Sequence, residues 1–192
     1  MTIVYETDKM TALLNTDAII TEVVGLSTSA TGAESPFDQF AAYKTVYRDT
    51  FDLWTITARD DASSSKLVGL YCFGDINQYH VFNRDSHTWS NAMRDAIIAK
   101  SIDESKVDYA CAIYVHADYT GQGISRSMQK KRTAYQISRG MTHSIIPQII
   151  GVGDVAKNLN TAIAAANSAE NIGADSDDNA IYLFTLSNDV WS

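Results

Sequence analysis

Two glycines, Gly121 and Gly123, stand where an apolar, strand-like run gives way to a polar, helix-competent one, in the segment YVHADYTGQGIS. Glycine weakens both strands and helices, so a glycine pair at such a junction indicates that the backbone itself is needed there. The first turn of a helix has N–H groups without intrahelical acceptors, and these groups and the helix dipole attract anions. The spacing therefore indicates a site that could bind an anion such as phosphate. The alternative is that the two glycines only shape the turn between strand and helix.

The residues after the glycines favour an anion but match neither of the better-known phosphate motifs. No Lys–Ser/Thr pair follows them as in a P-loop, and the third glycine of the dinucleotide fingerprint is missing. From Tyr119 to Gly153 there are five basic residues and no acidic one. They are Arg126, Lys130, Lys131, Arg132 and Arg139.

Together with the following run RSMQKKRTAYQISRG, this segment resembles the acetyl-CoA-binding motif of the GNAT N-acetyltransferase family. The specific resemblance extends over residues 115–140, and the order of elements around it is also similar to the family's. The matching residues are Val115, His116, Asp118, Tyr119, Gly121, Gln122, Gly123, Ile124 and, where the family's helix closes, Gly140.

The resemblance implies acetyl-CoA as cosubstrate and an amine of a small molecule or protein as acceptor, reached by direct attack in a ternary complex. The strand end from Ile113 to Val115 would hydrogen-bond the pantetheine arm, and the turn from Gln122 to Arg126 would cradle the pyrophosphate. The implied cofactor-binding residues are Ile113, Val115, Gln122, Gly123, Ile124, Ser125, Arg126 and Asn160.

The chain departs from the family's pattern at several positions. Thr120 replaces the usual Arg or Gln, Ser125 replaces a second Gly or Ala, and Arg132 falls where the family has a core leucine. The segment AIAAANSAENIG offers no tyrosine where many members carry the general acid, and Asn167 is the nearest match.

Acetyl transfer to an amine requires a neutral amine, an oxyanion donor and a thiolate that can leave. A backbone N–H near Val115 could serve as the oxyanion donor. Asp108 and Tyr114, at the two ends of the apolar run 107–115, are candidates for the base, with a structural role as the alternative for each. By the resemblance, His116 is a loop residue without chemistry.

The hydrophobic pattern predicts an α/β fold, and the resemblance makes it GNAT-like, a mixed, mostly antiparallel sheet with helices on both faces and a splayed central strand pair. Helices are expected over 8–24, 37–49, 90–100, 122–139 and 154–169, with a loop over 27–36. Strands are expected over 2–6, 51–59, 67–73, 107–115, 143–150 and 180–186, the second and third forming a hairpin.

Composition narrows the class of protein further. The 192 residues fit a single domain, and the net charge of −8 argues against nucleic-acid binding and favours a cationic partner. Cys72 and Cys111 lie in apolar runs and are expected to be buried, reduced thiols. His80 and His87 have no partner at ligand spacing, so no metal site is predicted.

No apolar run reaches the ~20 residues of a membrane span, and the N-terminus lacks the layout of a signal peptide, so the cytoplasm is the expected compartment. The oligomeric state is left open, with a homodimer as one alternative. The sequence thus predicts an N-acetyltransferase. The alternatives are a GNAT-like protein without catalysis that binds or inhibits a partner, and a binder of another phosphate ligand.

Overall fold

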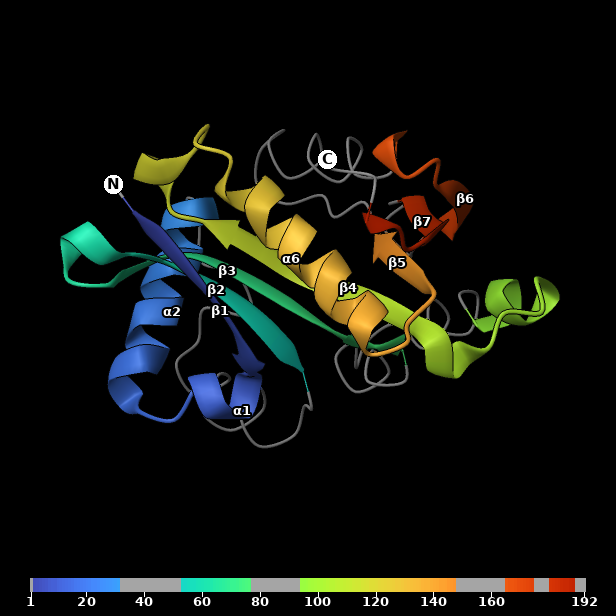
Figure 1. Ribbon diagram of the computed structural model, residues 1–192, viewed down its shortest axis with the longest axis horizontal. Helices are drawn as coiled ribbons and strands as arrows, with labels where there is room; N and C mark the ends of the chain where they lie inside the picture. Colours follow the sequence, from blue (N-terminus) through green and yellow to red (C-terminus); the bar gives the residue numbers. More distant parts are fainter. Residues whose placement is uncertain (1, 32–52, 77–93, 148–164, 175–179, 189–192) are drawn as a thin grey trace. The chain divides into compact units, whose positions relative to one another are not determined.

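The computed structural model describes residues 2–31, 53–76, 94–147, 165–174 and 180–188 (Figure 1). These residues form two compact units, which are considered one at a time. The first unit is Met1–Phe73 with Cys111–Arg132, and the second is Gly74–Ala110 with Thr133–Ser192. That residues 1–192 form a single domain stays a prediction.

The described strands form one sheet in the order β1-β2-β3-β4-β5-β7-β6. Neighbours are antiparallel in the pairs β1–β2, β2–β3, β5–β7 and β6–β7, whereas β4 and β5 are parallel. The strands are β1 (Ile3–Lys9), β2 (Trp54–Asp60), β3 (Lys66–Asp75), β4 (Val107–Val115), β5 (His143–Pro147), β6 (Glu170–Ala174) and β7 (Ala180–Thr185). The predicted mixed, mostly antiparallel sheet is confirmed.

The pairing of β4 with β5 is short. It joins Val107 to His143, Asp108 to Ser144 and Tyr109 to Ile145 and goes no further, although β5 continues to Pro147 along β7. The two strands therefore separate after three pairs, which confirms the splayed central strand pair.

Helices cover both faces of the strands in the first unit. They are α1 (Met10–Leu13), α2 (Asp17–Thr31) and the first part of α6 (Ile124–Ser138), and Figure 1 shows α2 on the far side of the strands from α6. A Cβ at Gly69 of β3 would lie 3.1 Å from Ile124 and from Met128, so a glycine there lets α6 approach the sheet closely. The core of this unit includes Met10, Leu14, Ile20, Val23, Leu26, Ile56, Leu70 and Phe73.

Most of the predicted elements are present. Strand β4 has the predicted bounds, the hairpin of β2 and β3 is found, and α6 lies within the predicted 122–139 and is followed by Gly140. The early helix is broken into α1 and α2 at Asn15, where the chain turns before Asp17.

Three expectations were wrong or incomplete. Residues 27–31 belong to α2 and not to a loop, because burial of Leu26 and Ser27 against the core overrides their Ser/Thr-rich composition. Strand β6 was not predicted, since its five residues lack an apolar alternation and Gly173 interrupts its register. Of the helix expected at 154–169, only residues 165 and 166 are helical among those described. The helix expected at 37–49 lies outside the described residues. Of the helix expected at 90–100, residues 90–93 lie outside them and 94–99 are helical.

Helix α2 is fastened to the hairpin of β2 and β3 through Glu22. Its carboxylate accepts a hydrogen bond from the Leu67 N–H at 2.7 Å and forms an ion pair with Arg59 at 3.1 Å. The same Arg59 guanidinium donates to the Ser65 carbonyl at 2.7 Å. Ser64 and Ser65 have φ of 53° and 61°, so the turn between the strands holds two non-glycine residues in the left-handed region.

The buried face of α6 is unusually polar. Beside Ile124 and Met128, it buries Gln129, Arg132, Thr133 and Gln136. Arg132, which falls where the GNAT family has a core leucine, is fully buried, with its guanidinium 5.4 Å from the ring of Tyr71 and 5.9 Å from that of Phe73. Burial lowers the pKa of Arg132, and the contact with Tyr71 opposes that shift. Cation–π stacking thus takes the place of aliphatic packing.

In the second unit, the fully buried carboxylate of Asp108 joins three elements. Gln136 of α6 donates a hydrogen bond to its Oδ1, and the hydroxyl of Ser144 in β5 donates to its Oδ2 at 3.1 Å. Arg139 extends the network by donating to the Gln136 side-chain oxygen at 3.0 Å and pairing with Asp75 at 3.4 Å. A buried carboxylate is tolerable here because both of its oxygens accept hydrogen bonds.

We expect Asp108→Ala to destabilise the protein strongly, because it leaves the buried donors of Gln136 and Ser144 without this acceptor. Each buried unsatisfied group costs about 1–3 kcal/mol, so the free energy of unfolding should fall by about 2 kcal/mol or more. Denaturant unfolding measures this directly. Ser144→Ala is the matched control and should cost less, since the hydrogen bond from Gln136 to Asp108 remains. An Asp108→Ala protein as stable as wild type would contradict this account of the network.

Candidate functional site

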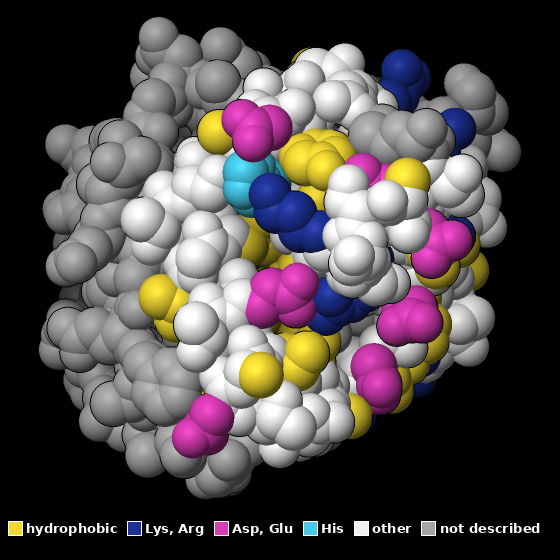
Figure 2. All heavy atoms as spheres, turned by 90° about the vertical axis from the view of Figure 1, so that its left-hand side faces the viewer, with side chains coloured by type: hydrophobic (Ala, Val, Ile, Leu, Met, Phe, Trp, Pro, Cys, Tyr) yellow, Lys and Arg dark blue, Asp and Glu magenta, His cyan; other side chains and the backbone are white. Residues whose placement is uncertain are grey.

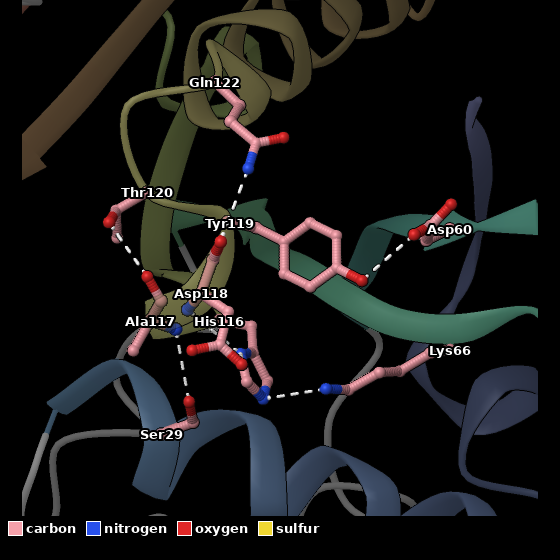
Figure 3. Close-up of polar contacts among 9 residues, drawn as sticks. All are labelled: Ser29, Asp60, Lys66, His116, Ala117, Asp118, Tyr119, Thr120 and Gln122. Carbon is pink, nitrogen blue, oxygen red and sulfur yellow. Dashed lines mark hydrogen bonds and ion pairs between the residues drawn. The ribbon is translucent and has the colours of Figure 1, made fainter. Parts of the chain in front are cut away.

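The segment from His116 to Gly123 connects β4 to α6 and is held from both sides (Figure 3). The His116 N–H donates to the Val68 carbonyl of β3 at 2.9 Å, and the Ala117 N–H donates to the hydroxyl of Ser29 in α2 at 3.2 Å. The residues Ala117–Tyr119 form a single 3-10 turn, η4, and the Thr120 hydroxyl donates back to the Ala117 carbonyl at 2.9 Å. The connection is therefore a fixed part of the first unit.

The two glycines of the connection have the conformation that only glycine adopts without strain. Gly121 has φ +77° and Gly123 has φ +75°, and among the described residues no atom lies within 4 Å of a Cβ built on either. Packing against this part of the chain therefore does not require glycine at either position, whereas the backbone conformation does. With respect to the described residues, the space beside both glycines is open to a ligand.

Helix α6 begins directly after this opening. The Ser127 N–H donates to the Gly123 carbonyl at 2.9 Å, which closes the first turn, and the first turn contains no acidic residue. The N–H groups that precede Ser127 have no acceptor within the helix, and the dipole places positive potential at this end. Such a turn suits an anionic group such as a phosphate.

Most of the expected cofactor-binding residues lie together in the first unit. Ile113 and Val115 are half-buried at the end of β4, Gln122 and Gly123 are exposed, and Ile124 is buried under the start of α6. Ser125 is half-buried and Arg126 exposed in the first turn of α6. Asn160 lies outside the described residues.

The two candidates for the base have different surroundings. Asp108 is fully buried in the second unit, and both of its oxygens already accept hydrogen bonds, which favours the structural role left open for it. Tyr114 lies near the end of β4 in the first unit, with 9% of its surface exposed. It stays a candidate for proton transfer.

A polar cluster beside the connection was not expected from the sequence. The Tyr119 hydroxyl donates to the carboxylate of Asp60 in β2 at 3.0 Å, and Lys66 Nζ lies 3.1 Å from His116 Nε2. These partners are separated by 59 and 50 positions, so no local spacing in the sequence could have indicated them.

Asp60 is almost completely buried, and its hydrogen bonds favour the ionised carboxylate. Burial alone would raise the pKa of Asp60, but hydrogen bonds from the Tyr119 hydroxyl, the Ser63 hydroxyl and the Ala62 N–H outweigh it. They hold the pKa below its usual value of 3.8. Tyr119 is thus fastened to an ionised acceptor, which anchors the connection to β2.

Other expectations concern chemistry away from this site. Cys72 is buried and makes no disulfide, which confirms the expected buried, free thiol at this position, and burial raises the pKa of the thiol to about 12. The side chain of Cys111 and both His80 and His87 lie outside the description. Within the described residues, no group of three or more His, Cys, Asp or Glu side chains is arranged to hold a metal ion. None of the described helices combines the length and apolar character needed to cross a membrane.

No protein-family model matches the sequence, and no curated protein matches it either. Solved structures do resemble the chain. The PaiA N-acetyltransferase of Thermoplasma acidophilum, solved with coenzyme A, has a TM-score of 0.57 at 11% identity, covering 96% of this chain and 99% of that one. A mosquito arylalkylamine N-acetyltransferase like 5b has a TM-score of 0.58 at 12% identity, covering 96% and 100%. The ribosomal-protein-S18-alanine N-acetyltransferase of Escherichia coli has a TM-score of 0.53 at 9% identity, covering 96% and 95%.

The chain therefore has the fold of the GNAT N-acetyltransferases. The likeness extends over nearly the whole of this chain and of the solved proteins. At such low identity the likeness establishes the fold alone. It confirms the fold that the resemblance of residues 115–140 implies.

We expect Tyr119→Phe to lower stability at neutral pH, because it removes a donor from the ionised carboxylate of Asp60. A carboxyl whose pKa is depressed on folding stabilises the protein above its unfolded pKa, 3.8, and this contribution is lost as pH falls through the lower folded value. The difference in stability between wild type and variant should therefore shrink below pH 3.8.

Urea midpoints measured from pH 7 down to pH 2 test this expectation. Tyr5→Phe is the matched control, because it removes the same atom from a half-buried tyrosine of the same unit. A difference for Tyr119→Phe that does not change with pH would show that the Asp60 contact is not responsible.

Proposed function

We propose that the protein is an acetyl-CoA-dependent N-acetyltransferase. The observation that carries the proposal is the open glycine turn between β4 and α6, in a chain whose fold is that of N-acetyltransferases. A solved protein with this fold, PaiA, holds coenzyme A. The first-turn N–H groups from Gly123 to Arg126 would bind the pyrophosphate, and Arg126 would add positive charge.

The separation of β4 from β5 supports the placement of the rest of the cofactor. The pairing of the two strands ends at Tyr109, whereas Ile113 and Val115 lie further along β4. Peptide groups of β4 beyond the pairing are therefore candidates to hydrogen-bond the amides of the pantetheine arm. An N–H near Val115 would then stabilise the oxyanion formed when an amine attacks the thioester.

The acceptor is an amine of a small molecule or a protein. Its nitrogen attacks the thioester carbonyl carbon directly in a ternary complex. The net charge of −8 favours an acceptor that is cationic before it loses its proton. An alkylamine has a pKa of about 10.4, so a group on the protein or a water relay must take up that proton. Tyr114 is the better of the two candidates, because protonation of Asp108 would disturb the buried hydrogen bonds with Gln136 and Ser144.

One observation favours a second function, a GNAT-like binding protein without catalysis. The resemblance implies a tyrosine general acid near the segment 165–169, and this chain has Asn167 there, in a turn before β6. Such a protein would bind the cofactor or a partner and transfer no acetyl group.

Two measurements on the purified protein separate these functions. Acetyl-CoA at about 100 times its Kd should add roughly 2.7 kcal/mol of stability, which raises the melting temperature by several degrees at about 2–4 °C per kcal/mol. Release of coenzyme A should then depend on an added amine from a panel of small amines and N-terminal peptides. Binding without amine-dependent release would favour the non-catalytic protein. No binding at millimolar acetyl-CoA would contradict the acetyltransferase and favour a non-catalytic protein that binds a partner.

We expect Gly123→Val to abolish acetyl-CoA binding and to leave the fold intact. A branched side chain at φ +75° would fill the open space over the first-turn N–H groups, and the left-handed conformation itself costs about 1–2 kcal/mol. Calorimetric titration with acetyl-CoA measures the effect.

The matched control is Gly140→Val at the other end of α6. Gly140 has φ +82°, so this change imposes a similar backbone strain at the C-terminal end of the helix. It should lower the melting temperature to a similar extent and leave acetyl-CoA affinity unchanged. Equal affinity for wild type and Gly123→Val would exclude this turn as the cofactor site.

A further inference from the structure

The side chain of Gln129 in α6 is buried without the contacts that a buried amide requires. Only 1% of its surface is exposed, and no hydrogen-bond partner is found for its Oε1 or its Nε2 among the residues that the structure describes. Figure 2 shows the usual alternative on one face of the molecule, where charged side chains lie at the surface and water can solvate them. A buried amide without partners destabilises a folded protein, so its presence calls for an explanation.

The periodicity of α6 places Gln129 over β4. Gln136 follows seven positions later, which is two turns of helix, so the two glutamines lie on the same face of α6. The amide of Gln136 donates to Asp108 near the start of β4, so Gln129 faces the same strand further from its start. Nearly opposite on the helix, Lys131 lies over the ring of Tyr5 in β1, so Gln129 points away from that edge of the sheet.

The distance along the helix places Gln129 beside the part of β4 that no longer pairs with β5. Helix α6 follows the end of β4 and reaches Asp108 at Gln136, so it runs back along the strand. Seven residues of helix rise about 10 Å, the length of about three strand residues, so Gln129 lies opposite β4 from about residue 111 onward. The pairing with β5 ends at Tyr109. Gln129 and this part of β4 belong to the first unit.

The side chain of Gln129 also leans toward the glycine turn. In an α-helix the Cα–Cβ bonds tilt toward the N-terminus, so a side chain covers the turn that precedes its own residue. For Gln129 this is the first turn of α6, with Ser125 four positions earlier on the same face. No hydrogen bond to the described residues fixes the amide. It can therefore rotate toward a ligand bound at this turn without losing a hydrogen bond.

An amide with both polar groups unsatisfied fits a ligand that offers a donor and an acceptor together. Oε1 accepts and Nε2 donates, and a secondary amide supplies one N–H and one C=O. A phosphate group supplies acceptors and leaves Oε1 without a donor. In acetyl-CoA the pyrophosphate is followed by the pantetheine arm, which contains secondary amides. The chemistry of Gln129 thus matches the part of the cosubstrate that comes after the group expected at the glycine turn.

We propose that Gln129 binds the cosubstrate by hydrogen-bonding a secondary amide of the pantetheine arm through Oε1 and Nε2. The inference rests on the proposed function, in which acetyl-CoA is the acetyl donor. The arm is then held between the peptide groups of β4 and a side chain of α6. Because this position is closed to water, an amide that binds there replaces hydrogen bonds that solvent does not supply.

Calorimetric titration of wild type and Gln129→Met with two ligands tests the proposal. Methionine is an unbranched, flexible, apolar side chain that fills the space and lacks the amide. We expect the affinity for acetyl-CoA to fall by on the order of tenfold, because two neutral hydrogen bonds are lost. The affinity for 3′-phospho-ADP, the nucleotide part of coenzyme A, should not change, because this ligand contains adenine and phosphates but no secondary amide.

Gln136→Met is the matched control, because it makes the same change at the other buried glutamine of α6. The amide of Gln136 contacts Asp108 and Arg139, so this variant should melt at a lower temperature and keep the wild-type affinity for acetyl-CoA. Without ligand, Gln129→Met should melt no lower than wild type, because an apolar side chain replaces an unsatisfied amide.

The outcomes separate this proposal from the proposed function. Equal affinities of wild type and Gln129→Met for acetyl-CoA would overturn the role of Gln129 and leave the proposed function standing. An equal loss of affinity for 3′-phospho-ADP would overturn it too, and so would a lower melting temperature of the ligand-free variant, which would show that the amide has a structural partner. Wild-type protein that does not bind millimolar acetyl-CoA would contradict the proposed function and, with it, this inference.

Discussion

The buried carboxylate of Asp108 is the constraint that organises the centre of the second unit. A buried carboxyl group is tolerated only if its oxygens are hydrogen-bonded, and the donors to both oxygens of Asp108 come from α6 and β5. This requirement fixes β5 beside β4 at the start of their pairing and fixes the rotation of α6 about its axis. Because α6 presents polar residues to the interior, its position is specified by directional contacts and not only by apolar packing. Arg132, stacked on Tyr71 and Phe73, plays the corresponding part in the first unit.

The connection between β4 and α6 combines a rigid base with an exposed backbone. Contacts from Ser29, Val68 and Asp60 hold its first half, whereas Gly121 and Gly123 leave its second half open to a ligand. Binding to a turn that is already ordered loses less conformational entropy than binding to a mobile loop. The same fixed turn places Nε2 of His116 3.1 Å from Nζ of Lys66.

The parts of the fold that the sequence predicted correctly are those encoded by neighbouring residues. The continuous apolar run of β4, the alternation in β2 and the closing Gly140 of α6 are local signals. The end of α2 and strand β6 were missed because long-range burial and pairing decide them. At the site, the glycine turn was visible in the spacing, whereas Lys66 and Asp60 were not, since their partners lie 50 and 59 positions away. A search for local motifs cannot detect such pairs.

The turn between β2 and β3 has a consequence for how the chain folds. Ser64 and Ser65 both adopt the left-handed region, which costs about 1–2 kcal/mol for each non-glycine residue, so the hairpin is weak by itself. The contacts that close it come from Arg59 and from Glu22 of α2, which reaches the Leu67 N–H across 45 positions. The strain of this turn is therefore offset partly by local contacts of Asp60 and Arg59 and partly by a helix distant in the chain, so the conformation of the turn depends on the docking of α2.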